Sequence, residues 1–326
     1  DEWEIWNEPF DQGEEYADMV YETAKAVREV QPKATCLVTA ISFSDDPKKS
    51  DYHKVVEKLK RENALDLVKY WVYHPYAANP DTSYAFAERL RKFVKGYNPD
   101  YDIVQGEVGC PAQLEFAHAL NGIEWTEHSQ AKWDLRRAIG DAARDVPSSV
   151  FTMIDLQYTF MLQSFGLVRS NALKEFVYRR PSWYAMRNVY ALFDDETLPQ
   201  KHLVLKGFPI RTRADPRETK PRDLACTLFT RYGQPLRFYW FCEARPDNRL
   251  EFDRVDLEIP EALSRPVWVD MITGRIFEIP GDRIEWRKDG MTLKDVPMWD
   301  SPVLIASRTA VPFVRESVVL QKEGGE

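Results

Sequence analysis

The chain of 326 residues is poor in cysteine and histidine, with four of the first and five of the second. The cysteines are scattered and lack the paired spacing of zinc sites, which argues against a structural metal: Cys36, Cys110, Cys226 and Cys242. The last two flank a predicted hairpin that turns at positions 233 and 234. We expect buried thiols there and no disulfide, because adjacent strands fit the geometry of the bridge poorly.

Long apolar runs and an excess of one kind of charge are also absent. No stretch of about 18 apolar residues occurs, so the sequence predicts no membrane span. No basic segment followed by an apolar one begins the chain, and the protein would be secreted or periplasmic if a signal preceded Asp1. The net charge of -8 comes from mixed acids and bases, which argues against nucleic acid or an anionic membrane as the main partner.

Short apolar runs alternate with helical periodicity through the first two hundred residues. Strands are expected at 1–8, 35–40, 65–76, 101–109 and 148–158. Helices are expected at 16–30, 50–63 and 82–97, from Ser129, and from Pro181. Nearly continuous apolar strands, each followed by a helix, indicate an α/β fold with parallel strands.

The pattern changes near residue 200 to short strands separated by Gly, Pro and Asp turns. Such a texture is typical of an antiparallel β-sandwich. The length also fits two domains. We therefore predict a catalytic domain over 1–198 and a β-sandwich accessory domain over 199–326.

Polar side chains stand at the ends of three predicted strands. Glu8 ends the first strand, His74 and Tyr76 end the third, and Glu107 ends the fourth. In a parallel barrel the catalytic groups lie at the C-terminal ends of the strands. Two carboxylates that meet at one mouth are what cleavage of a glycosidic bond requires.

These segments resemble clan A of the glycoside hydrolases, the retaining (β/α)8 enzymes. "WEIWNEP" resembles the acid/base motif at the end of the fourth barrel strand, "HPY" the His and Tyr at the sixth, and "GEVG" the nucleophile segment at the seventh. "DMITGRIFEI" and "DSPVLIA" are similar to the sandwich of family 39 and its neighbours. The resemblance implies the C-terminal part of a (β/α)8 TIM barrel, strands 4–8, followed by an antiparallel β-sandwich, with three βα units expected upstream of Asp1.

The resemblance also implies a function, which is retaining hydrolysis of an O-glycosidic bond by double displacement. Glu107 would be the nucleophile and Glu8 the acid/base. Asn7 would bind the sugar 2-hydroxyl, Tyr76 would orient the nucleophile, and His74 would line the same subsite. The partner would be an oligosaccharide or polysaccharide, and no cofactor or metal is expected.

Simpler interpretations of these residues remain open. Glu8 could be a first-turn helix acid, Glu107 a loop acid, His74 a core histidine and Tyr76 a packing residue. Trp3 and Trp6 are expected to pack within the barrel. Clan members often carry a Trp at the end of the eighth strand, and the substitutes available here are Asp155, Gln157, Tyr158, Trp125 and Trp133.

Two other functions compete with the hydrolase. One is a non-catalytic carbohydrate-binding protein on the same fold. The other is a metal-dependent barrel hydrolase that uses His74, Glu8, Glu107 and Asp155. Metal barrels usually need several histidines, so the second is disfavoured.

Overall fold

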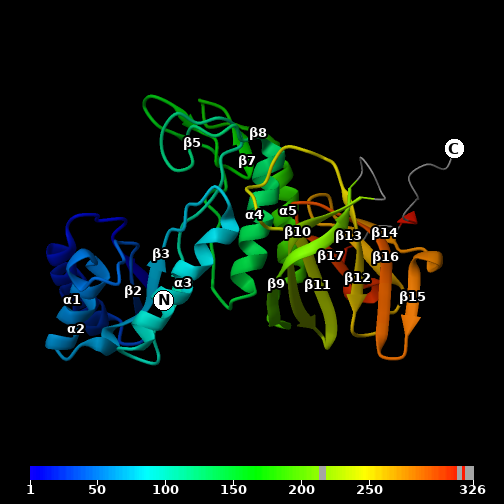
Figure 1. Cartoon of the computed structure of the whole chain (residues 1–326). Helices are drawn as coiled ribbons and strands as arrows, with labels where there is room; N and C mark the ends of the chain where they lie inside the picture. The colour runs from blue at the N-terminus through cyan, green and yellow to red at the C-terminus, as the bar shows by residue number, and fades with distance from the viewer. Residues whose placement is uncertain (213–217, 314–317, 320–326) are drawn as a thin grey trace. The chain divides into compact units, whose positions relative to one another are not determined.

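The computed structural model describes residues 1–212, 218–313 and 318–319, and the chain forms two compact units (Figure 1). Unit 1 consists of Asp1–Tyr76, Thr82–Val108 and Val146–Ser149. Unit 2 consists of Ala77–Asp81, Gly109–Asp145 and Val150–Glu326. Each unit has a hydrophobic core of its own.

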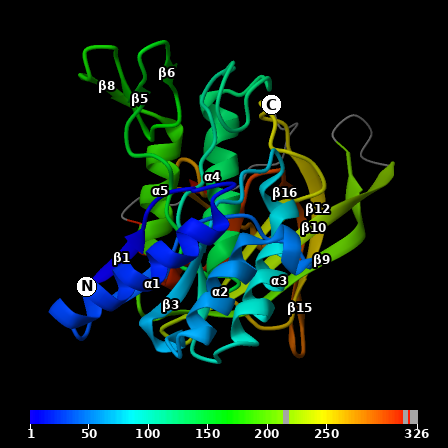
Figure 2. The same cartoon turned by 90° about the vertical axis from the view of Figure 1, so that its left-hand side faces the viewer.

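Unit 1 is built on a parallel sheet of four strands in the order β1-β2-β3-β4. Its strands are β1 (Glu2–Ile5), β2 (Thr35–Val38), β3 (Val68–Tyr73) and β4 (Asp102–Gln105). The connecting helices are α1 (Gly13–Val30), α2 (Asp51–Arg61) and α3 (Tyr84–Lys95), which lie next to one another in Figure 2. The strands run in one direction, so all four C-terminal ends lie at the same edge. The predicted parallel α/β arrangement is confirmed.

Helix α1 shows how local sequence shapes unit 1. Its buried face recurs at helical spacing through Tyr16, Val20 and Ala24. Acidic residues occupy its first turn and Arg28 its last, which complements the helix dipole. The first residue of the helix is Gly13, and a larger residue would clash there, because a Cβ would lie 2.0 Å from Oδ1 of Asp51, the first residue of α2.

The strand predicted over 148–158 is largely wrong. Ser148 makes only an isolated parallel bridge to Gln105, and the two-residue strand β5 (Leu156–Gln157) pairs with β6 (Leu162–Gln163). The backbone between them pairs with the segment that follows it in the sequence: Leu167 N donates to Thr152 O at 2.8 Å and Val168 N to Met153 O at 3.0 Å. The apolar run therefore satisfies its hydrogen bonds locally and not in the parallel sheet.

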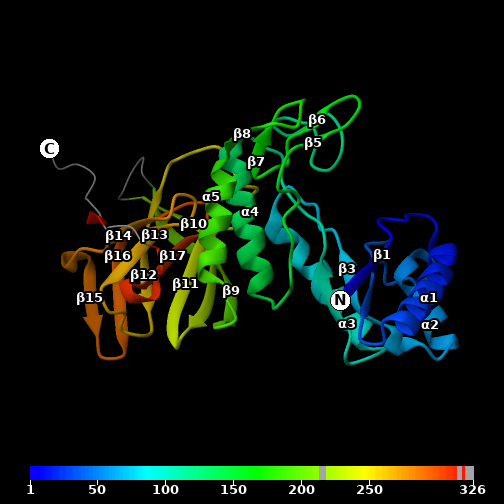
Figure 3. The same ribbon diagram turned by 180° about the vertical axis from the view of Figure 1, so that it is seen from behind.

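Unit 2 combines two helices with a sheet of ten strands. The helices are α4 (Glu127–Ala142) and α5 (Pro181–Leu192), which run side by side in Figure 3, and a small ladder joins β7 (Val168–Ser170) to β8 (Phe176–Arg179). The large sheet has the order β15-β16-β12-β9-β10-β11-β17-β13-β14-β18, antiparallel except between β14 and β18. Its strands are β9 (Thr197–Arg211), β10 (Thr219–Arg231), β11 (Gln234–Phe241), β12 (Asp253–Ile259), β13 (Pro266–Asp270), β14 (Arg275–Glu278), β15 (Ile284–Arg287), β16 (Gly290–Met298), β17 (Val303–Ser307) and β18 (Val318–Val319).

The helices and the sheet of unit 2 share one core. Leu135 of α4 and Val189 of α5 belong to the same buried cluster as Phe238 of β11 and Ile305 of β17. A domain boundary at residue 198/199 stays a prediction.

The β10–β11 hairpin is confirmed, but its register pairs Cys226 with Tyr239, so Cys226 and Cys242 do not face each other. Both cysteines carry free thiols, as expected. Within the described part of the chain, no helix has the length and apolar character needed to cross a membrane.

Candidate active site

Glu8 lies just beyond the C-terminal end of β1. The strand ends at Ile5 and α1 begins at Gly13, so Glu8 is outside the helix, and the first-turn interpretation is wrong. The backbone takes positive φ at Trp6 (69°) and at Glu8 (49°). Such conformations cost non-glycine residues free energy and are often found at functional sites.

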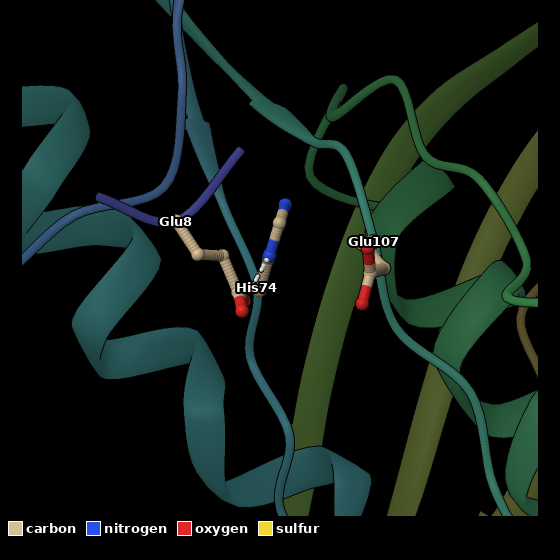
Figure 4. Close-up of side chains that lie close together, drawn as sticks. All are labelled: Glu8, His74 and Glu107. Carbon is tan, nitrogen blue, oxygen red and sulfur yellow. Dashed lines mark hydrogen bonds and ion pairs between the residues drawn. The ribbon is translucent and has the colours of Figure 1, made fainter. Parts of the chain in front are cut away.

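His74 binds Glu8 directly. It follows β3 without a gap, and its Nδ1 lies 2.6 Å from Glu8 Oε1 (Figure 4). The His74 side chain is 5% exposed and that of Glu8 is 33% exposed. The imidazole therefore fixes the orientation of a carboxyl that solvent and a ligand can still reach.

Tyr76 makes the matching contact with Glu107. The hydroxyl of Tyr76 donates a hydrogen bond of 2.8 Å to Glu107 Oε1. Glu107 follows β4, which ends at Gln105. The two carboxyls thus each have a partner from the end of β3, one an imidazole and the other a phenol.

Glu8, His74 and Glu107 converge, and Figure 4 shows Glu107 across from the Glu8–His74 pair. One nitrogen or oxygen atom from each lies within 4.8 Å of the others. Carboxyl groups about 5–5.5 Å apart are typical of retaining glycosidases, whereas inverting enzymes keep them about 6.5–9.5 Å apart. The nearest oxygens of Glu8 and Glu107 lie within 4.8 Å of each other, which agrees with the shorter of these two separations.

The strand ends are supported by residues that sequence reasoning missed. The buried Tyr16 hydroxyl donates to Ile5 O at 2.8 Å and accepts from Thr39 N at 2.9 Å, which ties β1 to the chain after β2. Burial raises the pKa of Tyr16, so its hydroxyl stays neutral. The periodicity assigned Tyr16 only to an apolar helix face. The available signal was its hydroxyl, which needs a hydrogen-bond partner when buried.

Asn7, Trp3 and Trp6 are exposed. Asn7 adjoins Glu8 in the sequence, as the predicted sugar contact requires. Trp6 is 65% exposed and Trp3 is 50% exposed. In the described chain neither side chain is buried, contrary to the expectation that both pack inside the barrel. The reason is that β1 is the edge strand of the four-stranded sheet, and most of its side chains face solvent.

The substitutes proposed for the eighth strand all belong to unit 2. Asp155 is buried and its carboxylate accepts from Arg180 Nη1 at 2.6 Å and Nη2 at 3.0 Å, and from two backbone N–H groups. Trp133 and Trp125 are buried and donate to backbone carbonyls of unit 2. Gln157 and Tyr158 are exposed in unit 2.

A cation could be held by Glu8, His74 and Glu107, which supply three ligand atoms. The four-residue metal set considered from the sequence also needs Asp155. Both oxygens of Asp155 are already occupied by the arginine and backbone donors, so this residue does not fit as a ligand. The donor set that remains consists of two carboxyls and one imidazole.

Comparison with solved structures identifies the fold of this chain. No family model matches the sequence, and no curated protein does. A solved family 51 α-L-arabinofuranosidase from Bifidobacterium longum matches with a TM-score of 0.56 at 13% identity, over 93% of this chain and 66% of that one. The chain has the fold of a clan A glycoside hydrolase.

Two further solved structures have lower TM-scores. A family 5 glycoside hydrolase from Bacteroides vulgatus scores 0.47 at 11% identity, over 94% of this chain and 70% of its own. The catalytic domain of family 30 xylanase C from Talaromyces cellulolyticus scores 0.47 at 9% identity, over 90% of this chain and 57% of its own. The predicted combination of a barrel-type α/β part and an antiparallel β part is confirmed. Membership of family 39 stays a prediction.

Proposed function

We propose that this chain carries the catalytic pair of a retaining glycoside hydrolase, with Glu107 as nucleophile and Glu8 as acid/base. The observation that carries the proposal is the convergence of both carboxyls within 4.8 Å at the ends of β1 and β4. The clan A fold supports it, because such barrels place their catalytic groups at this edge of the sheet.

In the first step, Glu107 attacks the anomeric carbon as the bond to the leaving oxygen breaks. Tyr76 holds Oε1 of Glu107, and Oε2 has no hydrogen-bond partner among the residues described, so Oε2 is the attacking atom. The proton of Glu8 passes to the leaving oxygen.

In the second step, the ester on Glu107 is neutral and Glu8 is a carboxylate. Glu8 takes a proton from water, the water oxygen bonds to the anomeric carbon, and the ester bond breaks to release Glu107. His74 holds Glu8 at 2.6 Å in both steps, and the orientation suited to protonation of the leaving group also suits activation of water.

The substrate proposal is a glycoside within an oligosaccharide or polysaccharide. The matched structure with a TM-score above 0.5 is an α-L-arabinofuranosidase, so aryl α-L-arabinofuranosides belong in the first substrate panel beside aryl β-glycosides. Retention in either class uses the same pair of carboxyls.

The test is hydrolysis of that panel by the wild type, Glu107→Gln and Glu8→Ala. Glu107→Gln should lose activity by at least about 10³-fold. Glu8→Ala should retain the first step on substrates with good leaving groups, and added azide should then form a glycosyl azide with retained configuration. A 2-fluoro glycoside should label Glu107, as read by mass spectrometry of the peptide.

Glu57→Gln is the matched control, since Glu57 is an exposed carboxylate that accepts from Tyr97 at 2.9 Å in another part of unit 1. Its activity should equal that of the wild type. Binding of oligosaccharides without turnover by the wild type would favour the carbohydrate-binding alternative. Activity that a chelator removes and a divalent cation restores would favour the metal-dependent one.

A further inference from the structure

Unit 2 contains a cavity of about 710 Å³. Its walls come from the start of α4, the end of β8 with the start of α5, the chain before β12, the β13–β14 turn and the chain after β16. Its volume is within the range of about 300–1,000 Å³ that small-molecule sites occupy. None of the residues predicted for catalysis lines it.

Two residues of the wall carry buried polar atoms without a partner. Nε2 of His128 and Nε1 of Trp299 are inaccessible to solvent, and neither makes a hydrogen bond within the described ranges. Trp299 is 5% exposed. Burial, together with nearby Lys132, lowers the pKa of His128 to about 4, so the imidazole is neutral at pH 7 and can donate or accept. A buried polar group without a partner costs free energy.

Two arginines give the cavity positive charge. Arg179 ends β8 and Arg275 begins β14, and both are exposed. Neither forms an ion pair with a carboxylate in the described part of the chain. Asp270, the acid on the same wall, already accepts from Thr273 Oγ1 at 2.5 Å and Ile272 N at 2.9 Å. Both side chains are exposed, so an external anion can reach them, although Arg179 also lies over the rings of Phe176 and Trp183.

Apolar side chains complete the wall. Tyr184 is 38% exposed and Leu250 is 65% exposed, while Phe252 packs on Trp299 with ring centroids 4.6 Å apart. A sugar ring presents C–H groups that pack against such a surface and hydroxyls that pair with buried polar atoms. A guanidinium binds a carboxylate with two parallel hydrogen bonds.

We propose that this cavity binds an acidic oligosaccharide through a sugar ring that carries a carboxylate. The carboxylate lies at Arg179 and Arg275, and the sugar ring packs on Tyr184 and Leu250. The proposal does not rest on hydrolysis, since the catalytic pair belongs to unit 1. The chain as a whole carries a net charge of -8, so the attraction of the anionic sugar comes from the two nearby arginines alone. Salt should screen this attraction.

The test is calorimetric titration of the whole chain in a Glu107→Gln background, so that turnover does not consume the ligand. The probes are an oligogalacturonide and a glucuronic-acid-bearing xylo-oligosaccharide, each beside its methyl ester as the neutral match. At least one acid should bind about tenfold or more tightly than its ester. Arg179→Gln and Arg275→Gln should each weaken that binding about tenfold.

Arg287→Gln is the charge-matched control, because Arg287 is an exposed arginine of β15 that pairs with Glu258 away from the cavity. It should bind like the parent. Acid and ester that bind equally, two acids that do not bind, or arginine variants that bind like the parent would each overturn the proposal. Equal melting temperatures of the variants would show that a loss of binding is not a loss of folding.

Discussion

At the scale of single residues, the candidate pair is held by two side chains that are close in sequence. His74 and Tyr76 follow β3, and Tyr76 N donates to His74 O at 3.0 Å, so a tight turn places both. His74 contacts the carboxyl of Glu8, and Tyr76 donates to the carboxyl of Glu107. A retaining mechanism gives the two carboxyls different roles, and in this site each carboxyl has a different hydrogen-bond partner.

Tyr76→Phe removes the hydrogen bond to Glu107 and leaves the ring in place. A hydrogen bond to a charged group is worth about 1.5–3 kcal/mol, so kcat should fall about 10- to 100-fold with little change in KM. The measurement is steady-state hydrolysis of the best aryl glycoside from the panel. Tyr97→Phe deletes an equivalent tyrosine–glutamate bond just after the end of α3 and should leave kcat unchanged. Equal losses in both variants would mean that Tyr76 acts only through stability.

Glu8, Glu107, His74 and Tyr76 could be selected from the sequence because each ends an apolar run, and strand ends share an edge in a parallel sheet. Which carboxyl each partner holds could not be selected. That pairing depends on the register of β3 against its neighbours and on the turn after Tyr73, and neither leaves a mark in composition or periodicity. The role of Tyr16 was missed for the same reason. Its helical spacing predicts that the ring faces the core, but it does not predict the hydrogen bonds of the hydroxyl.

At the scale of elements, Gly106 sets the approach between the ends of β3 and β4. A Cβ at position 106 would lie 2.3 Å from Cγ1 of Val72 and 3.5 Å from Nε2 of His74. Gly106→Ala should therefore push the β4 end away from β3 and displace Glu107, its neighbour. We expect kcat/KM to fall by about 10²-fold, because positional errors near 1 Å are this costly.

Gly281→Ala is the control for the glycine substitution. A Cβ at Gly281 meets no atom of the described residues within 4 Å, and its activity should match the wild type. Crystal structures of both variants would show whether Glu107 moved. A Gly106→Ala variant with normal kinetics would imply that Val72 yields without moving the end of β4.

The helices were predictable because their apolar faces repeat every three or four residues over at least three turns. The run over 148–158 shows the limit of this method. An apolar stretch fits a parallel strand as well as an irregular segment, and Met153 and Ile154 are in fact 55% and 45% exposed. The choice was made by local pairing with residues 165–168, a contact that sequence periodicity does not encode.

At the scale of the whole molecule, the described interior of unit 2 holds ten buried charged side chains, and five of them lie on α4. Lys132 pairs with Asp300 at 2.6 Å, and Arg136 and Arg137 pair with Asp81 and Asp141. Removal of one partner from such a buried pair is costly, because a charge remains without compensation. Sequence periodicity predicts the helix but not the burial of its charged side chains, which only the tertiary fold shows.

Buried titratable groups in unit 2 make stability depend on pH from both sides. Burial lowers the pKa of His202 and of His128 to about 4. Between pH 6.5 and 4 the unfolded chain therefore binds more protons than the folded one. Stability contributed by these histidines is present at neutral pH and is lost as the pH falls through this window.

Asp134 acts in the opposite direction. It is 2% exposed, both carboxyl oxygens lack a hydrogen-bond partner in the described ranges, and burial raises its pKa well above the ordinary value of 3.8. The folded state keeps a proton that the unfolded chain loses above pH 4, so the free energy of unfolding should fall as pH rises.

Asp134→Asn removes this titration. Urea midpoints measured from pH 5 to 9 should decline in the wild type and decline less in Asp134→Asn, with the largest gain for the variant at pH 9. The exposed Asp66→Asn is the control and should follow the wild type, since Asp66 is 74% exposed in its side chain. Parallel curves for wild type and Asp134→Asn would show that the carboxyl is solvated or paired in solution.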